Sequence, residues 1–191
     1  IFDNTTHNFS RLPIVVDGKE LGNTLVFTMS PDYDGNMWIG TLGQGLLRYN
    51  LATQTFSQYD AQSHPRIFER NTVAKIIVDE EHNIWIGLGG SYICRYNAEQ
   101  DDLTPFKVED SISRQTISRV STIYEDIVGN IWVAGLAGDL FLFDRANNRF
   151  TRNMPGFTCD RIRSIIERKP GVLLLGTNQG IVSFDVRERS F

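Results

Sequence analysis

Cysteine is scarce in this sequence of 191 residues, and long apolar runs are missing. The two cysteines, Cys94 and Cys159, are too few for a disulfide framework, so we expect each to be an isolated buried thiol. No apolar run approaches the roughly 20 residues that cross a bilayer, and the start "IFDNTTHNFS" lacks the basic and apolar regions of a signal peptide. We therefore expect this segment not to be inserted in a membrane.

An excess of basic residues is also missing. The chain has 19 Lys and Arg against 23 Asp and Glu, a formal net charge of -4, which gives no electrostatic basis for binding nucleic acid. The histidines at positions 7, 64 and 82 form neither an HExxH motif nor a Cys/His zinc spacing, and they indicate no Ser-His-Asp set. The sequence therefore predicts no metal, no cofactor and no nucleic-acid partner.

What the sequence has in abundance is an internal repeat. Tryptophan recurs at a fixed interval of 47 residues, at Trp38, Trp85 and Trp132. The same interval relates the apolar, acidic and amide residues around each tryptophan. A fourth copy follows with Leu174 in the tryptophan place, and its "GIVSFD" at 180–185 matches "GLLRYN" at 45–50. The repeat unit is therefore copied four times, with decay in the last copy.

Each copy contains four short apolar runs separated by turn signals, with no helical period. In the first copy we predict strands at about 24–29, 36–41, 45–50 and 55–59. Four short strands per repeat are typical of a β-propeller blade. The predicted fold is therefore all-β, with four antiparallel repeats of about 47 residues as four-stranded blades. We expect the end of a preceding blade at 1–12 and blades at 24–59, 72–108, 117–153 and 161–191, the last with an incomplete outer strand.

Two closures of the propeller are open. One is a four-bladed ring in which residues 8–12 form the outer strand of the fourth blade. The equivalent points at which the chain enters and leaves the repeat, "FDNTTHNF" at 2–9 and "FDVRERSF" at 184–191, would permit this closure. The other is an arc of a larger ring.

The pattern V-x-x-I-x-x-D-x-x-G-N-I-W-I-G-T, followed by a glycine-rich turn and an L-x-R-Y-N/D strand, closely resembles the two-component regulator propeller repeat. It is present at 26–50, 73–97 and 120–144 and more weakly at 162–185. The second copy departs from it with His82 in place of the turn glycine, and the fourth lacks the tryptophan and the aspartate.

The resemblance implies a place in the periplasmic sensor region of a hybrid two-component system of the Bacteroides type, anchored in the inner membrane. It implies rings of about seven blades, so we favour an arc of a larger propeller that further blades complete. It implies a histidine kinase core in the parent protein and a homodimeric parent. It also implies an oligosaccharide released from glycans as the ligand, and control of transcription as the output.

Most recurring residues have a structural explanation. We expect the three tryptophans to fill the space between neighbouring sheets, while Gly40 and Gly87 let a neighbouring backbone approach. The recurring aspartates follow the first strand of a blade, so we expect them to accept hydrogen bonds from turn N–H groups. These aspartates are Asp32, Asp79 and Asp126.

The positions where the copies differ are the better candidates for ligand contacts. The loops at 60–72 and 108–118 are long and unlike each other, and propeller ligands generally bind on the face where such loops open. Arginines and a tyrosine on one rim would suit an acidic or hydroxyl-rich sugar, although ordinary solvated loop residues explain them as well. The candidates are His64, Arg66, Arg70, Asn71, Tyr92, Arg114, Gln115, Arg119 and Arg161.

Three classes of function compete. The first is a non-catalytic sensor segment that binds a ligand or transmits its binding. The second is a scaffold for protein–protein interaction or dimerisation. The third is a propeller lyase or glycosidase, which would need acids from the long loops such as Asp60, Glu69, Glu109 and Asp110. Fold alone does not decide between them.

Overall fold

The structure is a computed structural model that describes residues 2–110, 114–152 and 161–190. Every regular element in these ranges is a β-strand, and the strands of each large sheet follow one another as an antiparallel meander. The predicted all-β fold is confirmed. Within these ranges there is no helix of the length and apolar character needed to cross a bilayer.

Four large sheets correspond to the four copies of the repeat. The first comprises β5 (Leu25–Pro31), β6 (Asn36–Leu42), β7 (Leu46–Asn50) and β8 (Thr55–Tyr59). The second comprises β9 (Val73–Val78), β10 (Ile84–Leu88), β11 (Tyr92–Asn97) and β12 (Asp102–Lys107). The third comprises β13 (Val120–Glu125), β14 (Ile131–Gly135), β15 (Leu140–Asp144) and β16 (Arg149–Arg152). The fourth comprises β17 (Ile162–Lys169), β18 (Val172–Thr177) and β19 (Gly180–Asp185).

The predicted blade limits at 153 and 191 lie outside the described residues, as do 111–113 of the second long loop and Cys159. The first strand of the first blade runs two residues beyond the predicted 24–29, because Ser30 and Pro31 continue to pair with Trp38 and Met37.

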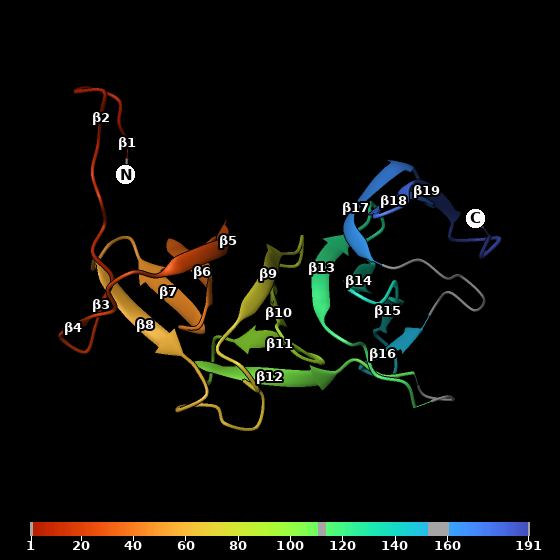
Figure 1. Ribbon diagram of the computed structural model, residues 1–191, viewed down its shortest axis with the longest axis horizontal. Coiled ribbons are helices and arrows are strands. Elements are labelled where there is room, and N and C mark those ends of the chain that lie inside the picture. Colours follow the sequence, from red (N-terminus) through yellow and green to blue (C-terminus); the bar gives the residue numbers. More distant parts are fainter. Residues whose placement is uncertain (1, 111–113, 153–160, 191) are drawn as a thin grey trace.

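The four blades follow one another in an arc, with the first and fourth blades at opposite ends (Figure 1). The first strands of successive blades contact each other, and β8, β12 and β16 lie on the outer side of the arc. Strand β2 (Asn8–Phe9) pairs with β1 (Phe2–Asp3) and not with the fourth blade. The ring closure through residues 8–12 is therefore not the arrangement of this structure.

Each tryptophan fills the wedge between its own blade and the next. Trp38, Trp85 and Trp132 are all 0% exposed. Trp38 shares an apolar cluster with Val73 and Ile76 of the second blade. The later tryptophans do the same one blade further along, Trp85 against Val120 and Trp132 against Ile162. Aromatic side chains thus supply the largest buried surfaces between sheets.

The glycine two residues after each of the first two tryptophans admits a side chain of the next blade. A Cβ added at Gly40 would lie 2.7 Å from Val73 Cγ1, and one at Gly87 would lie 2.6 Å from Val120 Cγ1. The sequence predicts that a neighbouring backbone approaches these glycines. A close approach is present, but the group that approaches from the next blade is a valine side chain.

The recurring aspartate ties the turn to the tryptophan. Asp32 accepts the backbone N–H of Asn36 at 2.8 Å, and its second oxygen accepts the Asn36 side-chain amide and the Trp38 indole N–H, each at 2.8 Å. Burial raises the pKa of this carboxyl, but the hydrogen bonds from Asn36 and Trp38 outweigh it and leave the pKa of Asp32 below its ordinary value. The same indole contact recurs at 2.8 Å for Trp85 with Asp79 and at 2.9 Å for Trp132 with Asp126.

The fourth blade lacks this aspartate and tryptophan, and Glu167 provides a different link. One oxygen of Glu167 accepts the N–H of Gly171 in its own turn at 2.7 Å. The other accepts the N–H of Ile127 in the third blade, also at 2.7 Å. Glu125 makes the matching contact one blade earlier, accepting the N–H of Glu80 at 3.0 Å. Carboxylates of one blade therefore bind the turn between the first two strands of the preceding blade.

Both ends of the arc expose positions that are buried inside it. Val26 and Met29 of β5 are 40% and 61% exposed, whereas their counterparts Val73 and Ile76 are 0% and 3% exposed. At the other end Ile181 is 77% exposed, whereas its counterpart Leu46 is 0% exposed. Apolar surface of this kind is stabilised when another blade covers it. The two end blades thus lack the neighbour that covers these positions inside the arc.

The chain before the first blade forms two small hairpins. In β1–β2 the turn residue His7 has φ 54°, and Gln54, at the same place in the β7–β8 turn, has φ 56°. The second hairpin, β3 (Val15–Val16) with β4 (Lys19–Glu20), packs Val16 against Ile39 and Leu47 of the first blade. It therefore covers part of the first blade's open face.

Candidate functional site

The loop at 60–72 places two of the predicted ligand residues in one pocket. His64 and Arg66 line a pocket of about 270 Å³ together with Asp102, Leu103 and Pro105 of the second blade. His64 Nε2 lies 2.8 Å from Asp102 Oδ1, and His64 Nδ1 lies 2.8 Å from Ser63 Oγ. The hydrogen bond from His64 lowers the pKa of the Asp102 carboxyl below its ordinary value.

The imidazole of His64 thus lies between a hydroxyl and a carboxylate, an arrangement that the sequence did not indicate because Asp102 is distant in the chain. Ser63 Oγ also accepts the N–H of Asp60 at 2.9 Å. Asp60 Oδ1 in turn accepts the N–H groups of Gln62 and Ser63 at 2.9 and 3.0 Å. The hydroxyl therefore closes a turn that starts at Asp60, which is the ordinary use of serine and aspartate in loops.

This pocket lies on the outer side of the arc and not at a channel mouth. Strands twist from one to the next, so the outer strand of a blade runs across the rim. In Figure 1 the end of β8 approaches the start of β12, and the loop leaves from there. His64 consequently contacts Asp102, the first residue of β12.

Asn71 and Tyr92 have structural contacts. The backbone oxygen of Asn71 accepts the N–H groups of Gly43 and Gly45 in the β6–β7 turn, and its side-chain oxygen accepts the N–H of Ala61 at 2.7 Å. Tyr92 is half-buried and packs against the apolar cluster between the first and second blades. Arg70, beside Asn71, is exposed.

The remaining candidates lie at other junctions between blades. Arg114 forms an ion pair with Glu109 at 3.0 Å, and Gln115 accepts a hydrogen bond from Arg152 of the third blade at 2.8 Å. Arg119 and Arg161 are exposed just before β13 and β17. The structure therefore brings His64 and Arg66 together and distributes the other candidates over several junctions.

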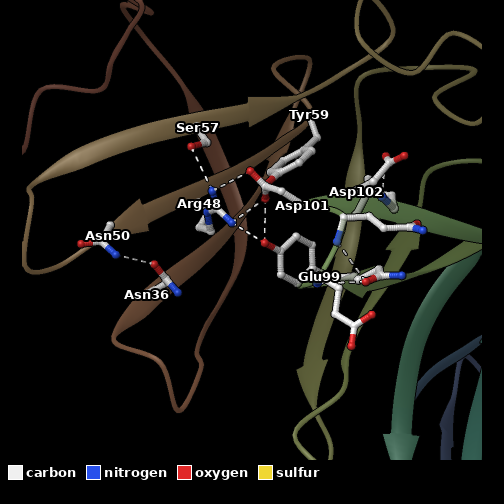
Figure 2. Close-up of polar contacts among 12 residues, drawn as sticks. Asn36, Arg48, Asn50, Ser57, Tyr59, Glu99, Asp101 and Asp102 are labelled. Atoms are coloured by element: carbon white, nitrogen blue, oxygen red, sulfur yellow. Dashed lines mark hydrogen bonds and ion pairs between the residues drawn. The ribbon is translucent and has the colours of Figure 1, made fainter.

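A polar cluster at the junction of the first and second blades was not found from the sequence. We define the Arg48 cluster as Arg48 and Tyr59 of the first blade with Tyr96 and Asp101 of the second (Figure 2). The Arg48 guanidinium donates to both Asp101 oxygens at 2.7 and 3.3 Å and to the Tyr96 hydroxyl. The hydroxyls of Tyr59 and Tyr96 each donate to Asp101 Oδ1 at 2.7 Å.

These contacts shift the titration of the cluster in both directions. Hydrogen bonds from Tyr96 and Tyr59 and the Arg48 charge lower the pKa of Asp101 from 3.8 to about 2, against a smaller opposing effect of burial. Burial and the hydrogen bond to Asp101 raise the pKa of Tyr96 from 10.0 to about 12. The same two causes raise the pKa of Tyr59.

We expect the stabilisation by this cluster to depend on pH at both ends of the scale. Because the folded state lowers the pKa of Asp101, its contribution is complete above about pH 4 and is lost as the pH falls through about 2. Because the folded state raises the pKa of Tyr96, its contribution is complete below about pH 10 and is lost as the pH rises through about 12. Urea unfolding of the unmodified chain and of Tyr96→Phe measures this, and the stability difference between them should shrink above pH 10. A difference that stays constant up to pH 12 would contradict the assignment.

Other chemistry on the described residues is limited. Within 2–110, 114–152 and 161–190, no group of three or more His, Cys, Asp or Glu side chains is arranged to hold a metal ion. Cys94 is a buried free thiol, and burial raises its pKa to about 12, so it is held as the unreactive thiol form at neutral pH.

Antiparallel four-stranded blades in an arc, with tryptophan wedges between them, define a β-propeller fold. Residues 20–43 match the family model described as two component regulator propeller, and this match confirms the resemblance seen in the sequence. No curated protein is significantly similar to the chain in sequence.

Solved structures similar to the chain include two from B. thetaiotaomicron. The extracellular domain of BT3049, described as a putative hybrid two component system, has a TM-score of 0.73 and 19% identity over 89% of this chain and 24% of its own. That of BT4673 has a TM-score of 0.69 and 24% identity over 84% of this chain and 21% of its own. Virginiamycin B lyase from Staphylococcus aureus has a TM-score of 0.60 and 14% identity, over 85% of this chain and 56% of its own. The chain thus spans about a quarter of the length of the two extracellular domains, and these likenesses establish the fold.

Proposed function

We propose that the chain is a non-catalytic segment of the sensor domain of a hybrid two-component system. In this role it contributes to recognising a ligand outside the cytoplasm, in the periplasm, and to passing the signal to a kinase that controls transcription. The observation that carries the proposal is the two-component regulator propeller repeat at 20–43, in an arc of blades that resembles the extracellular domains of two such systems. The proposed ligand is an oligosaccharide.

The exposed faces at both ends of the arc support a place within a larger propeller. Further blades of the parent protein would cover Val26 and Met29 at one end and Ile181 at the other. Rigid junctions such as the Arg48 cluster would then transmit a displacement from blade to blade, because packed interfaces have discrete arrangements. We also propose that the parent sensor is a homodimer.

A ligand screen on the complete extracellular region of the parent sensor tests the proposal. We expect one class of oligosaccharide to raise the melting temperature, since a ligand at 100 times its Kd stabilises the folded state by about 2.7 kcal/mol. Chromatography of the same sample should recover the oligosaccharide unchanged. If no member of a broad panel raises the melting temperature, the proposed ligand class is wrong. If the oligosaccharide is cleaved, the proposed absence of catalysis is wrong.

A further inference from the structure

Arg95 of β11 is a cation without an anionic partner. Its guanidinium lies over the rings of Trp85 and Phe106, 5.6 and 5.7 Å from their centroids, and the residue is half-buried. Among residues 2–110, 114–152 and 161–190, no hydrogen bond or ion pair satisfies this guanidinium. Its hydrogen-bond donors are therefore available to an anion that binds beside it.

The preceding copy of the repeat shows what this position can bind. Arg48 is the counterpart of Arg95, 47 residues earlier, and it also lies over a tryptophan, with its guanidinium 5.7 Å from the Trp38 centroid. There the guanidinium holds both oxygens of a carboxylate, at 2.7 and 3.3 Å, supplied by Asp101 of the next blade (Figure 2). An arginine fork matches a carboxylate in this two-point manner.

The second junction keeps the arginine and loses its partners. The counterpart of Asp101 is Asn148, which has nearly the same backbone conformation, φ 51° against 48°. The counterparts of Tyr59 and Tyr96 are Phe106 and Phe143, which have no hydroxyl. The place that a protein carboxylate fills beside Arg48 therefore has no protein carboxylate beside Arg95.

Arg95 opens on a pocket of about 400 Å³ with further polar groups. Asn97 and Thr104 line it, and the carboxylates of Asp34 and Glu99 lie on its wall. Next to it Tyr33, which is 68% exposed, stacks on His82 with ring centroids 3.8 Å apart. Two wall carboxylates repel a polyanion but accept hydrogen bonds from hydroxyl groups. A ligand with one carboxylate and several hydroxyls would complement both the arginine and these wall carboxylates.

We infer that this pocket is a subsite for an acidic sugar, with the sugar carboxylate on Arg95 and its hydroxyls on Asp34, Glu99 and Asn97. The inference rests on the proposed function in that it names the class of ligand and a site for it. The pocket lies away from the loops at 60–72 and 108–118. Those loops join one blade to the next, whereas the pocket is formed by turns at the opposite ends of the strands.

Titration of the ¹⁵N-labelled chain with galacturonate, followed by NMR, tests the inference. Galactose has the same ring hydroxyls without the carboxylate and serves as the matched sugar. We expect galacturonate to shift the amide signals of Arg95 and Asn97, and galactose to leave them unchanged. Arg95→Gln should weaken binding about tenfold or more, because a charge-assisted, two-point contact is lost.

The sharper variant is Asn148→Asp, which restores the carboxylate that Asp101 provides in the first junction. We expect the introduced carboxylate to occupy Arg95 and to weaken galacturonate binding about tenfold, while the chain stays folded. Gln54→Asp is its matched control, since Gln54 has φ 56° at the same turn position and the substitution adds the same charge away from Arg95. This control should bind galacturonate as the unmodified chain does.

Three results would overturn the inference. These are no galacturonate shifts in the unmodified chain, equal binding of galactose or of simple acetate, or binding unaffected by both Arg95→Gln and Asn148→Asp. Each would remove the acidic-sugar subsite and leave the melting-temperature response of the complete extracellular region intact. Conversely, a working subsite in a region whose stability responds to no oligosaccharide would contradict the sensor proposal alone.

Discussion

Replacing Trp85 with alanine should lower the free energy of unfolding by about 3–5 kcal/mol, the range for truncating a buried large aromatic side chain. Trp85 is 0% exposed and lies 4.9 Å from Phe143 of the next blade between ring centroids, so the change opens a cavity between two sheets. It also removes the hydrogen bond that the indole N–H donates to Asp79, which is 0% exposed as well. Urea unfolding followed by circular dichroism measures the loss.

Trp85→Phe separates the two contributions. Phenylalanine keeps much of the apolar volume but cannot donate to Asp79, so we expect a smaller loss of about 1–3 kcal/mol, set by the lost hydrogen bond to a buried carboxylate that keeps its bonds from Asn83. If Trp85→Ala unfolds at the same urea concentration as the unmodified chain, tryptophan is not the wedge that joins the blades.

Gly87→Ala should destabilise the chain by about 1–3 kcal/mol, because the added methyl group overpacks the second junction. The new Cβ would lie 2.6 Å from Val120 Cγ1 and 3.3 Å from Ile123 Cδ1. Shortening the opposing side chain with Val120→Ala should recover part of the loss, so the double variant should be more stable than the sum of the single changes predicts. Urea unfolding of the three variants measures this coupling.

Gly35→Ala is the matched control for this cycle. Gly35 has φ +80° and nothing within 4 Å of an added Cβ, so its cost arises from backbone strain alone. It should show no coupling to Val120→Ala. Equal coupling for Gly35 and Gly87 would contradict a steric role for Gly87.

The repeat allowed the fold to be predicted because it gives both the length of one blade and the positions of the strands within it. Alternating and continuous apolar runs fixed the strands, and turn signals such as Gly35 and Asn36 located the hairpins. The hairpin at 15–20 was missed although Asp17 and Gly18 carry its signal, a two-residue Asp-Gly turn between Val16 and Lys19. It lies before the first copy of the repeat, so the period of 47 residues gives no information about it.

The bond between each tryptophan and its aspartate was also missed, although one signal was present. The fourth copy loses both residues together, and partners in a buried hydrogen bond are expected to be lost as a pair. Trp38 and Asp32 are six residues apart across a turn, a separation that sequence periodicity alone does not connect.

The candidate sites were the least predictable part, because side-chain contacts across blades depend on how far the sheets twist. The Arg48–Asp101 pair joins residues 53 positions apart, and neither residue lies in the loops that the sequence favoured. A comparison of junctions would have found it, since Tyr59, Tyr96 and Asp101 in one junction become phenylalanine, phenylalanine and asparagine in the next.

The central claim is that residues shared by the copies build the blades and that recognition occurs where the junctions differ. Hydrogen–deuterium exchange of the complete extracellular region, with and without an acidic oligosaccharide, tests it most directly. We predict slower exchange in peptides covering 92–104 when the ligand is present, and unchanged exchange in the recurring turn at 126–130. Ligand protection that is confined to that turn, or that is equal in every blade, would contradict the account.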